Sequence, residues 1–271
     1  MVNNESMAGI LDGFLQALGL LASFNSEIYE IMFLSLFVSG MATIIASLIG
    51  VPFGALISLR RFRGKELVKT VTYTFMGLPP VVAGLFIFLI FVRVGPFGAL
   101  DLLYTPTIMI IAQITLATPV ITGVTISAVS SVPKEVRDTA LSLGATDWQS
   151  TFTILNEARI GIITAIITGF GSCISEVGAV MIVGGNIRYE TRVLTTAIMT
   201  STSVGDYGYG IALGIILLIL AFLVNVPLVR LQRRHSNQEH VETAKPNKAR
   251  RNAKTRLTVC PKIGSGIAID E

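Results

Sequence analysis

Long runs of apolar residues dominate this chain, and their length is the first feature that decides its class. Five runs are long enough to cross a hydrocarbon core of about 30 Å, which takes roughly 20 residues in a helix. Backbone polar groups inside lipid need partners, and the runs are too long and too continuously apolar for barrel strands. Each is therefore predicted to be a transmembrane helix. The five runs are Ile31–Leu59, Val71–Val92, Pro106–Val129, Ile160–Val183 and Ile211–Val229.

The composition agrees with this pattern, because 52% of the residues are hydrophobic, 14% are charged and the mean hydropathy is +0.70. Soluble globular domains have a different balance. We therefore predict an all-α integral membrane protein with five transmembrane helices. A sixth crossing, by residues 7–24, stays open. Asp12, Gly13 and Gln16 interrupt that short stretch, which favours a helix lying at the membrane surface.

Basic residues are distributed unevenly between the loops, and this orients the helices, since Lys and Arg stay on the cytoplasmic side of short loops. Of the 21 Lys and Arg residues, 18 lie in three alternate segments, 60–70, 130–159 and 230–271. The N-terminus is therefore predicted outside the cytoplasmic membrane and the C-terminus inside. The net charge of +4 follows from this distribution, so it is no evidence for nucleic-acid binding.

The predicted organisation has three parts. Residues 1–27 form an external segment with the interfacial helix, and residues 28–230 form the transmembrane domain with a cytoplasmic loop at 130–159. Residues 231–271 form a basic tail that is too polar to bury a core. We expect this tail to stay disordered or to lie on the anionic inner leaflet.

The polar loop at 130–159 carries the local signals of two short helices separated by a bend. Ser131, ahead of a proline, is typical of a helix start, and Gly144 supplies the left-handed conformation that ends a helix. Thr146 and Gln149 then fit a capping box that opens a second helix. This helix carries three large apolar side chains that are costly to expose to water, Trp148, Phe152 and Ile154. The loop is therefore either a solvated connection or a docking element.

The spacing within this loop resembles a motif of ABC-importer permeases. Asp138-Thr139-Ala140, three residues, Gly144, nine residues and Ile154 resemble the EAA loop of that family, Glu-Ala-Ala, three residues, Gly, nine residues and Ile-x-Leu-Pro. The resemblance implies that these five residues couple the chain to a separate ATPase subunit, by a helix that docks into a groove on it.

The resemblance covers most of the chain. MGLPPVVAGL at 76–85, SEVGAVMIVGGNIR at 175–188 and TRVLTTAI at 191–198 resemble the permeases of tungstate ABC importers and, next, molybdate permeases. It implies a molybdate-importer-type ABC permease fold, working in membrane lipid as a homodimer with cytoplasmic ABC ATPase subunits and an external oxyanion-binding protein. ATP then belongs to the partner subunit, and no cofactor is expected on this chain. Molybdate or another oxyanion, a carrier without an ATPase, and a membrane scaffold are the alternatives.

Features inside the predicted spans indicate a pathway or gate. Pro79 and Pro80 lack backbone N–H groups, and so does Pro52, which predicts kinked or broken helices. Such breaks are tolerated where protein or a water-lined cavity satisfies the freed groups. Glu176 is the only carboxylate within a predicted span, and it would repel an oxyanion, so we expect a structural or gating role rather than proton coupling. The candidate pathway or gate residues are Gly77, Pro79, Pro80, Glu176 and Gly178.

Small residues recur at every fourth position in the first span and again in the fifth, which predicts close helix packing. The positions are Ala42, Ala46, Gly50 and Gly54, and then Gly210 and Gly214.

On the external side, Asn186, Arg188 and Arg192 could offer weak hydrogen-bond donors to a passing oxyanion. The alternative interpretation is that both arginines pair with Glu190 or contact the binding protein.

Enzyme signatures are missing from the sequence. It contains no GxxxxGK[ST] loop for ATP, and Leu213 stands where a GxGxxG fingerprint beginning at Gly208 needs its third glycine. His235 and His240 lie in the tail without further ligand spacing, so no metal site is expected. We predict a subunit that is not itself an enzyme.

Overall fold

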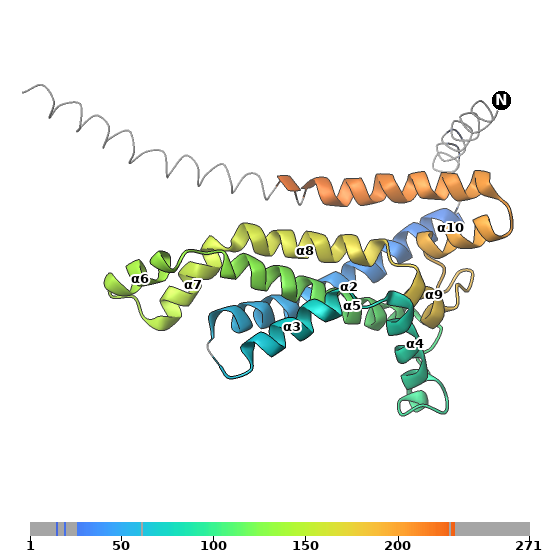
Figure 1. Ribbon diagram of the computed structural model, residues 1–271. Coiled ribbons are helices and arrows are strands. Elements are labelled where there is room, and N and C mark those ends of the chain that lie inside the picture. Colours follow the sequence, from blue (N-terminus) through green and yellow to red (C-terminus); the bar gives the residue numbers. More distant parts are fainter. Residues whose placement is uncertain (1–14, 16–18, 20–25, 61, 228, 231–271) are drawn as a thin grey trace, which may run out of the picture. The chain divides into compact units, whose positions relative to one another are not determined.

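The structure is a computed structural model that describes residues 15, 19, 26–60, 62–227 and 229–230. The predicted interfacial helix near the N-terminus and the basic tail at 231–271 lie outside the described residues, so both stay predictions. All regular elements of the described part are helices (Figure 1).

The helices follow one another with short connections. In chain order they are α2 (Ser26–Leu59), α3 (Lys65–Met76), α4 (Pro80–Phe91), the 3-10 turn η1 (Gly98–Leu100), α5 (Pro106–Ser130), α6 (Lys134–Ser142), α7 (Asp147–Glu157), α8 (Arg159–Ile174), α9 (Gly178–Gly184), α10 (Leu194–Ser203) and the helix Tyr207–Pro227. Three of them, α2, α5 and Tyr207–Pro227, are each long and apolar enough to cross a membrane. If each of the bent pairs α3 with α4 and α7 with α8 is one span, the number of candidate spans rises to the predicted five. The second pair begins at Asp147, before the predicted run Ile160–Val183.

Two of the five predicted runs are not continuous helices. The run Val71–Val92 breaks at Gly77–Pro79, where α3 and α4 meet at an angle of 97°. Two consecutive prolines explain this break, because they remove adjacent donors and the second begins a helix well. The run Ile160–Val183 also stops, at the end of α8, and resumes as α9. At Pro52, by contrast, α2 continues as one helix, so the break considered there is absent.

The helices α2 and α5 pack closely along the small residues that the sequence pattern indicated. The buried stripe on α2 is Ala42, Ala46, Gly50 and Gly54. A Cβ atom on Gly54 would lie 2.7 Å from the Cβ of Thr125 on α5. Such close backbone approach is what holds helices together in lipid. The second predicted pair is not a stripe, because Gly210 is buried but a Cβ on Gly214 would meet no atom within 4 Å.

Buried apolar side chains hold the ends of the bundle. Leu194 and Leu213 belong to a cluster that joins α2, α8, α10 and the helix Tyr207–Pro227. Met109 and Val183 belong to another, which joins α2, α4, α5 and α9.

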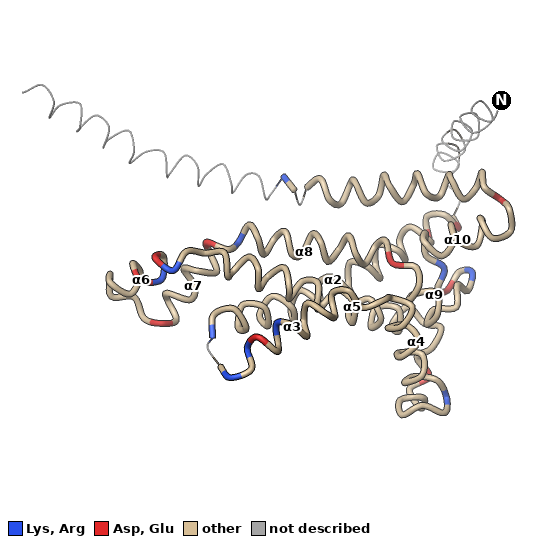
Figure 2. The backbone as a smooth tube through the Cα atoms, viewed as in Figure 1, with Lys and Arg blue, Asp and Glu red and all other residues tan. Residues whose placement is uncertain are grey.

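Figure 2 shows Lys and Arg gathered in the turn between α2 and α3 and around α6 and α7. The polar loop at 130–159 therefore stands at one end of α5 and α8, and the break before α9 stands at the other.

Candidate functional site

The loop at 130–159 folds as two short helices around a glycine. Gly144 has a φ of +86° and its N–H donates to the carbonyl of Leu141 at 3.0 Å, which ends α6. Thr146 then caps α7, because its hydroxyl accepts from the N–H of Gln149 at 3.3 Å and its own N–H donates to Gln149 Oε1 at 2.8 Å. The predicted bend and capping box are both present, and they arise from neighbouring residues alone.

The start of α6 differs from the prediction. Ser131 does not cap this helix, because its hydroxyl donates to the carbonyl of Ser127 at 2.8 Å, at the end of α5. The N-cap position belongs to Pro133 instead. Ser131 is a poor cap here because its own N–H also donates to Ser127, at 3.0 Å, which keeps it in the last turn of α5.

The two short helices present apolar side chains outward. Leu143 is 83% exposed, Trp148 is 77% exposed and Phe152 is 68% exposed. Trp148 and Phe152 are four residues apart and therefore share one face of α7. Exposed apolar groups of this size are typical of interaction surfaces. Among the residues of the EAA-like motif, Asp138, Thr139 and Gly144 are exposed and Ala140 is half-buried.

Ile154 has the opposite position, since it is only 7% exposed and packs with Val129 of α5 and with Ala158. Ala158 ends α7 and begins α8, and the two helices are bent by 59°. Ile154 therefore packs α7 against the end of α5 and the start of α8.

The two interrupted runs meet at their breaks. A Cβ atom on Gly178, the first residue of α9, would lie 2.8 Å from Val81 Cγ2 at the start of α4. A Cβ on Gly84 would lie 2.7 Å from the Cα of Ala179. The glycines thus let the backbones of α4 and α9 touch. The structure places the stretch from Gly77 to Pro80 and the stretch from Glu176 to Gly178, predicted separately, in one junction of broken helices.

Glu176 lies in this junction between α8 and α9 rather than inside a helix. Its Oε1 accepts a hydrogen bond from the N–H of Ala179 at 3.0 Å, and its carbonyl accepts from the hydroxyl of Thr195 at 2.9 Å. The first bond gives the half-buried carboxylate a partner, and the second holds the backbone of Glu176. Both agree with the structural role that we expect for this residue.

Glu176→Gln is expected to keep transport within about threefold of the wild type, since a neutral amide oxygen accepts the same N–H with a weaker bond. The pH profile of uptake should not move. The measurement is initial uptake across a pH series in cells producing equal amounts of each protein. Glu176→Ala, which removes the acceptor, is the companion variant and should lose more. A pH profile of uptake that shifts in both variants would support proton coupling instead.

The residues predicted on the external side are held by a partner that the sequence pattern did not indicate. Arg188 Nε donates to Glu27 Oε1 at 2.7 Å, and Arg192 lies 3.8 Å from the same oxygen. The described residues show no ion pair with Glu190 for either arginine, so the predicted pairing there is wrong. The hydrogen bonds to Glu27 raise the pKa of the Arg188 guanidinium above its ordinary value. Asn186, with a φ of +52°, donates to the hydroxyl of Thr200 at 2.6 Å.

Comparison with known proteins identifies the family of this chain. Residues 50–237 match the family of binding-protein-dependent transport system inner membrane components. The chain belongs to this family. It is thus a multi-pass permease subunit of an ABC importer, whose ATPase is a separate subunit, and not an enzyme by itself.

Three relatives align with most of the permease's length. It is 43% identical over 226 residues to the tungstate uptake system permease protein of Peptoclostridium acidaminophilum, which covers 83% of this chain and 99% of that protein. It is 44% identical over 205 residues to a probable anion ABC transporter permease protein of Haloferax volcanii, with coverage of 74% and 88%. The molybdenum transport system permease protein of Azotobacter vinelandii is 26% identical over 208 residues, with coverage of 74% and 92%.

Solved structures confirm the predicted permease fold. A bacterial alginate ABC transporter aligns with a TM-score of 0.68 at 20% identity, covering 85% of this chain and 88% of that one. The inward-facing methionine transporter MetNI aligns with a TM-score of 0.64 at 19% identity, covering 78% and 97%. At these identities the likeness concerns the fold alone.

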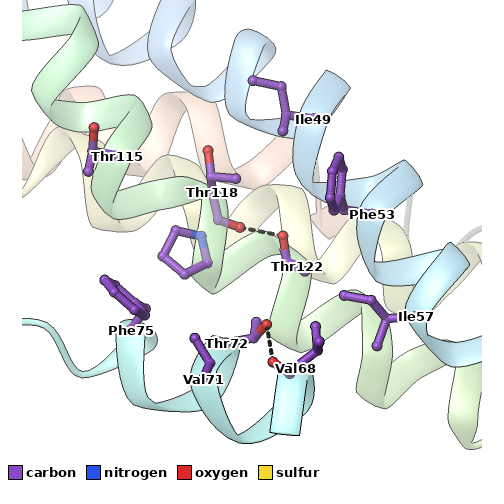
Figure 3. A pocket seen from close by; sticks show the side chains of 11 residues that line it. Ile49, Phe53, Ile57, Val68, Val71, Thr72, Phe75, Thr115, Thr118 and Thr122 are labelled. Atoms are coloured by element: carbon purple, nitrogen blue, oxygen red, sulfur yellow. Dashed lines mark hydrogen bonds between the residues drawn. The ribbon is translucent and has the colours of Figure 1, made fainter. Parts of the chain in front are cut away.

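An open groove between α2, α3 and α5 of the permease is a poor oxyanion site (Figure 3). Its volume is about 340 Å³, and most of its lining is apolar. The hydroxyls of Thr72, Thr115, Thr118 and Thr122 each donate to a carbonyl of their own helix, at 2.7 to 2.9 Å. Because these protons are already used and no basic residue lines the groove, nothing there binds a dianion.

Sequence reasoning missed two residues of this site. Glu27, at the start of α2, was assigned to an external segment and given no role. Gly84 is the fifth residue of α4, within the apolar run Val71–Val92. A glycine in an otherwise apolar helix is a signal for close backbone approach, but the identity of the partner, Ala179, needs the fold.

Proposed function

We propose that this chain is the permease subunit of an ABC importer that moves tungstate across the cytoplasmic membrane, driven by ATP hydrolysis on a separate subunit. The observation that carries the substrate is the 43% identity to a tungstate permease along 99% of that protein. Identity to a molybdenum permease is 26%, which makes molybdate the weaker alternative. Family membership leaves no support for a carrier without an ATPase or for a scaffold.

The proposed docking surface for the ATPase is the exposed face of α6 and α7, with Leu143, Trp148 and Phe152 as its apolar centre. Desolvated aromatic side chains at the centre of an interface carry most of its binding energy. Asp138, Thr139, Ala140 and Gly144 shape this surface, while the buried Ile154 anchors it to the bundle. The side of α7 that faces the ATPase thus differs from the side that faces α5.

The proposed coupling runs along α8. This helix begins at the joint with α7 and ends at the break before α9, so its 16 residues span about 24 Å between the docking surface and the gate. Nucleotide-dependent movement of the ATPase would change the position of α7, and the rigid α8 would carry the change to the junction of α4 and α9. Coupling of this kind needs two global states that both sites favour differently.

The proposed gate is the junction of the two broken helices, formed by Gly77, Pro79, Pro80, Glu176 and Gly178. Broken helices in transporters line the path at the level where the substrate passes. The arginines at 188 and 192 are proposed to hold the external end of α2 through Glu27 and to lie near the contact with an oxyanion-binding protein. Their charges are shared with a carboxylate, which suits weak contact with a passing dianion.

We further propose the orientation with the N-terminus outside and the C-terminus inside, and assembly of two copies with two ATPases. The distribution of Lys and Arg supports the orientation. ATP binds to the partner subunits in this proposal, and no residue of the described part is assigned to a cofactor.

Deleting the gene for this chain is expected to lower tungsten accumulation at least about tenfold at trace external tungstate and molybdate supplied together, because passive entry of a dianion through lipid is very slow. Molybdenum accumulation should change little. The measurement is the content of both metals in washed cells by mass spectrometry, with the intact gene restored as the control. Selective loss of molybdenum would show that the chain transports molybdate instead of tungstate. Unchanged accumulation of both metals would contradict the proposal.

A further inference from the structure

A buried glutamine in α5 contacts the end of α8. Gln113 is 3% exposed, and its Nε2 donates to the carbonyl oxygen of Cys173 at 3.0 Å. Its Oε1 is buried without a hydrogen-bond partner among the described residues. A buried amide oxygen left without a partner is destabilising and uncommon. A polar side chain that packing alone would replace with an apolar one therefore stands inside a transmembrane helix, as the eighth residue of α5.

The carbonyl that Gln113 binds belongs to the last turn of α8. The same oxygen of Cys173 accepts the N–H of Glu176 at 3.2 Å, so it lies where the helix stops. The Glu176 carboxylate in turn accepts a hydrogen bond from the N–H of Ala179, and the hydroxyl of Thr195 on α10 donates to the Glu176 carbonyl. Gln113 and Thr195 thus fasten the break between α8 and α9 from two neighbouring helices.

The position of this contact along α8 gives it a mechanical meaning. At its other end α8 joins α7 at Ala158, in the packed cluster with Ile154. A displacement that enters through α7 would therefore reach the Cys173 carbonyl after passing along the whole helix. Nearer the joint with α7, the contacts between α5 and α8 are apolar: a Cβ atom on Gly161 would meet Ala128, and Ile162 packs on the cluster that contains Val129. The side-chain hydrogen bond from Gln113 is at the gate end.

We propose that Gln113 is a positioning residue of the transport cycle. Its amide holds the end of α8 against α5 and thereby fixes the position of the break between α8 and α9 in one of the two access states. This inference rests on the proposed function. If a shift of α8 breaks this bond, the free-energy difference between the two access states changes by about the energy of one hydrogen bond. A single side chain can exert an effect of this size.

Gln113→Met tests this contact, because methionine has nearly the same length and offers no N–H donor. It also removes the unpaired oxygen, so folding should be preserved. The matched control is Thr122→Val on the same helix, since Thr122 is equally buried but its hydroxyl donates only to Thr118 of its own helix, at 2.7 Å. Both variants are reconstituted in vesicles with the ATPase and the binding protein, and tungstate transported per ATP hydrolysed is measured.

The expected result is a ratio about fivefold lower for Gln113→Met and unchanged for Thr122→Val. A purely structural defect would lower uptake and hydrolysis together and leave the ratio where it was, and that outcome would overturn the proposal. The second measurement is hydrogen exchange of the backbone amides at 174–179 in the same vesicles, expected to be about fivefold faster in Gln113→Met. Unchanged exchange would show that the Gln113 amide does not stabilise the break between α8 and α9.

The exchange measurement also separates this inference from the proposed function. Vesicles with the wild-type chain that fail to accumulate tungstate would count against tungstate as the substrate. The exchange rates at 174–179 would still decide whether Gln113 clasps the end of α8.

Discussion

Replacing Trp148 and Phe152 together with glutamate will lower ATP-driven tungstate uptake by more than about 100-fold, because two carboxylates cannot be buried without partners in an apolar interface. The two side chains are 77% and 68% exposed on one face of α7, so neither contributes to the core of the permease. The amount of permease in the membrane should therefore stay the same. Uptake of tungstate into cells and immunoblotting of the same membranes measure the two quantities.

The matched control keeps the surface apolar. Trp148→Phe combined with Phe152→Leu is expected to transport within about threefold of the wild type, since volume and hydrophobicity are nearly conserved. Wild-type uptake by the glutamate variant would show that this face of α7 is not where the ATPase docks. A variant that vanishes from the membrane would show that the two side chains serve folding, contrary to their exposure.

Gly84→Val will lower tungstate uptake by about tenfold or more, because it forces α4 and α9 apart at the proposed gate. A Cβ atom at position 84 would lie 2.7 Å from the Cα of Ala179. A backbone atom cannot rotate away as the end of a flexible side chain can, so the helices themselves must move. The measurements are the rate of tungstate uptake and the temperature of unfolding of the purified permease.

Gly214→Val is the control for this substitution. Gly214 also lies within a transmembrane helix, but a Cβ there would meet no atom within 4 Å, so transport and unfolding temperature should be close to those of the wild type. The milder variant Gly84→Ala should fall between the two. Equal uptake by Gly84→Val and Gly214→Val would mean that contact between α4 and α9 is not needed for transport.

The polar loop at 130–159 was the part of the candidate site whose local structure the sequence predicted best. Gly144 ends α6 with a positive φ, and Thr146 and Gln149 form the capping box, because both signals involve residues within one turn of each other. Ser131 shows the limit of the same reasoning. The pattern predicted that its hydroxyl caps α6, but the hydroxyl donates to Ser127 because the helix α5 continues through this residue.

The external cluster shows what sequence spacing does not reveal. Glu190 lies two residues from each arginine and was the natural partner, yet both contact Glu27, which lies 161 residues away from Arg188. Distances along the chain say nothing about such a pair. The direction of the loop after α9 and the start of α2 together decide it.

By itself, the sequence determined that this is a helical membrane protein, how many apolar runs it has, and where the polar loop at 130–159 lies. These properties follow from residue-by-residue transfer between water and lipid and from interactions within a turn. The tertiary structure alone decided that the break at Gly77–Pro79 meets the break after Ile174, and that Gln113 reaches the end of α8. Such contacts depend on the angles and offsets at which rigid helices pack, and no short stretch of sequence encodes those.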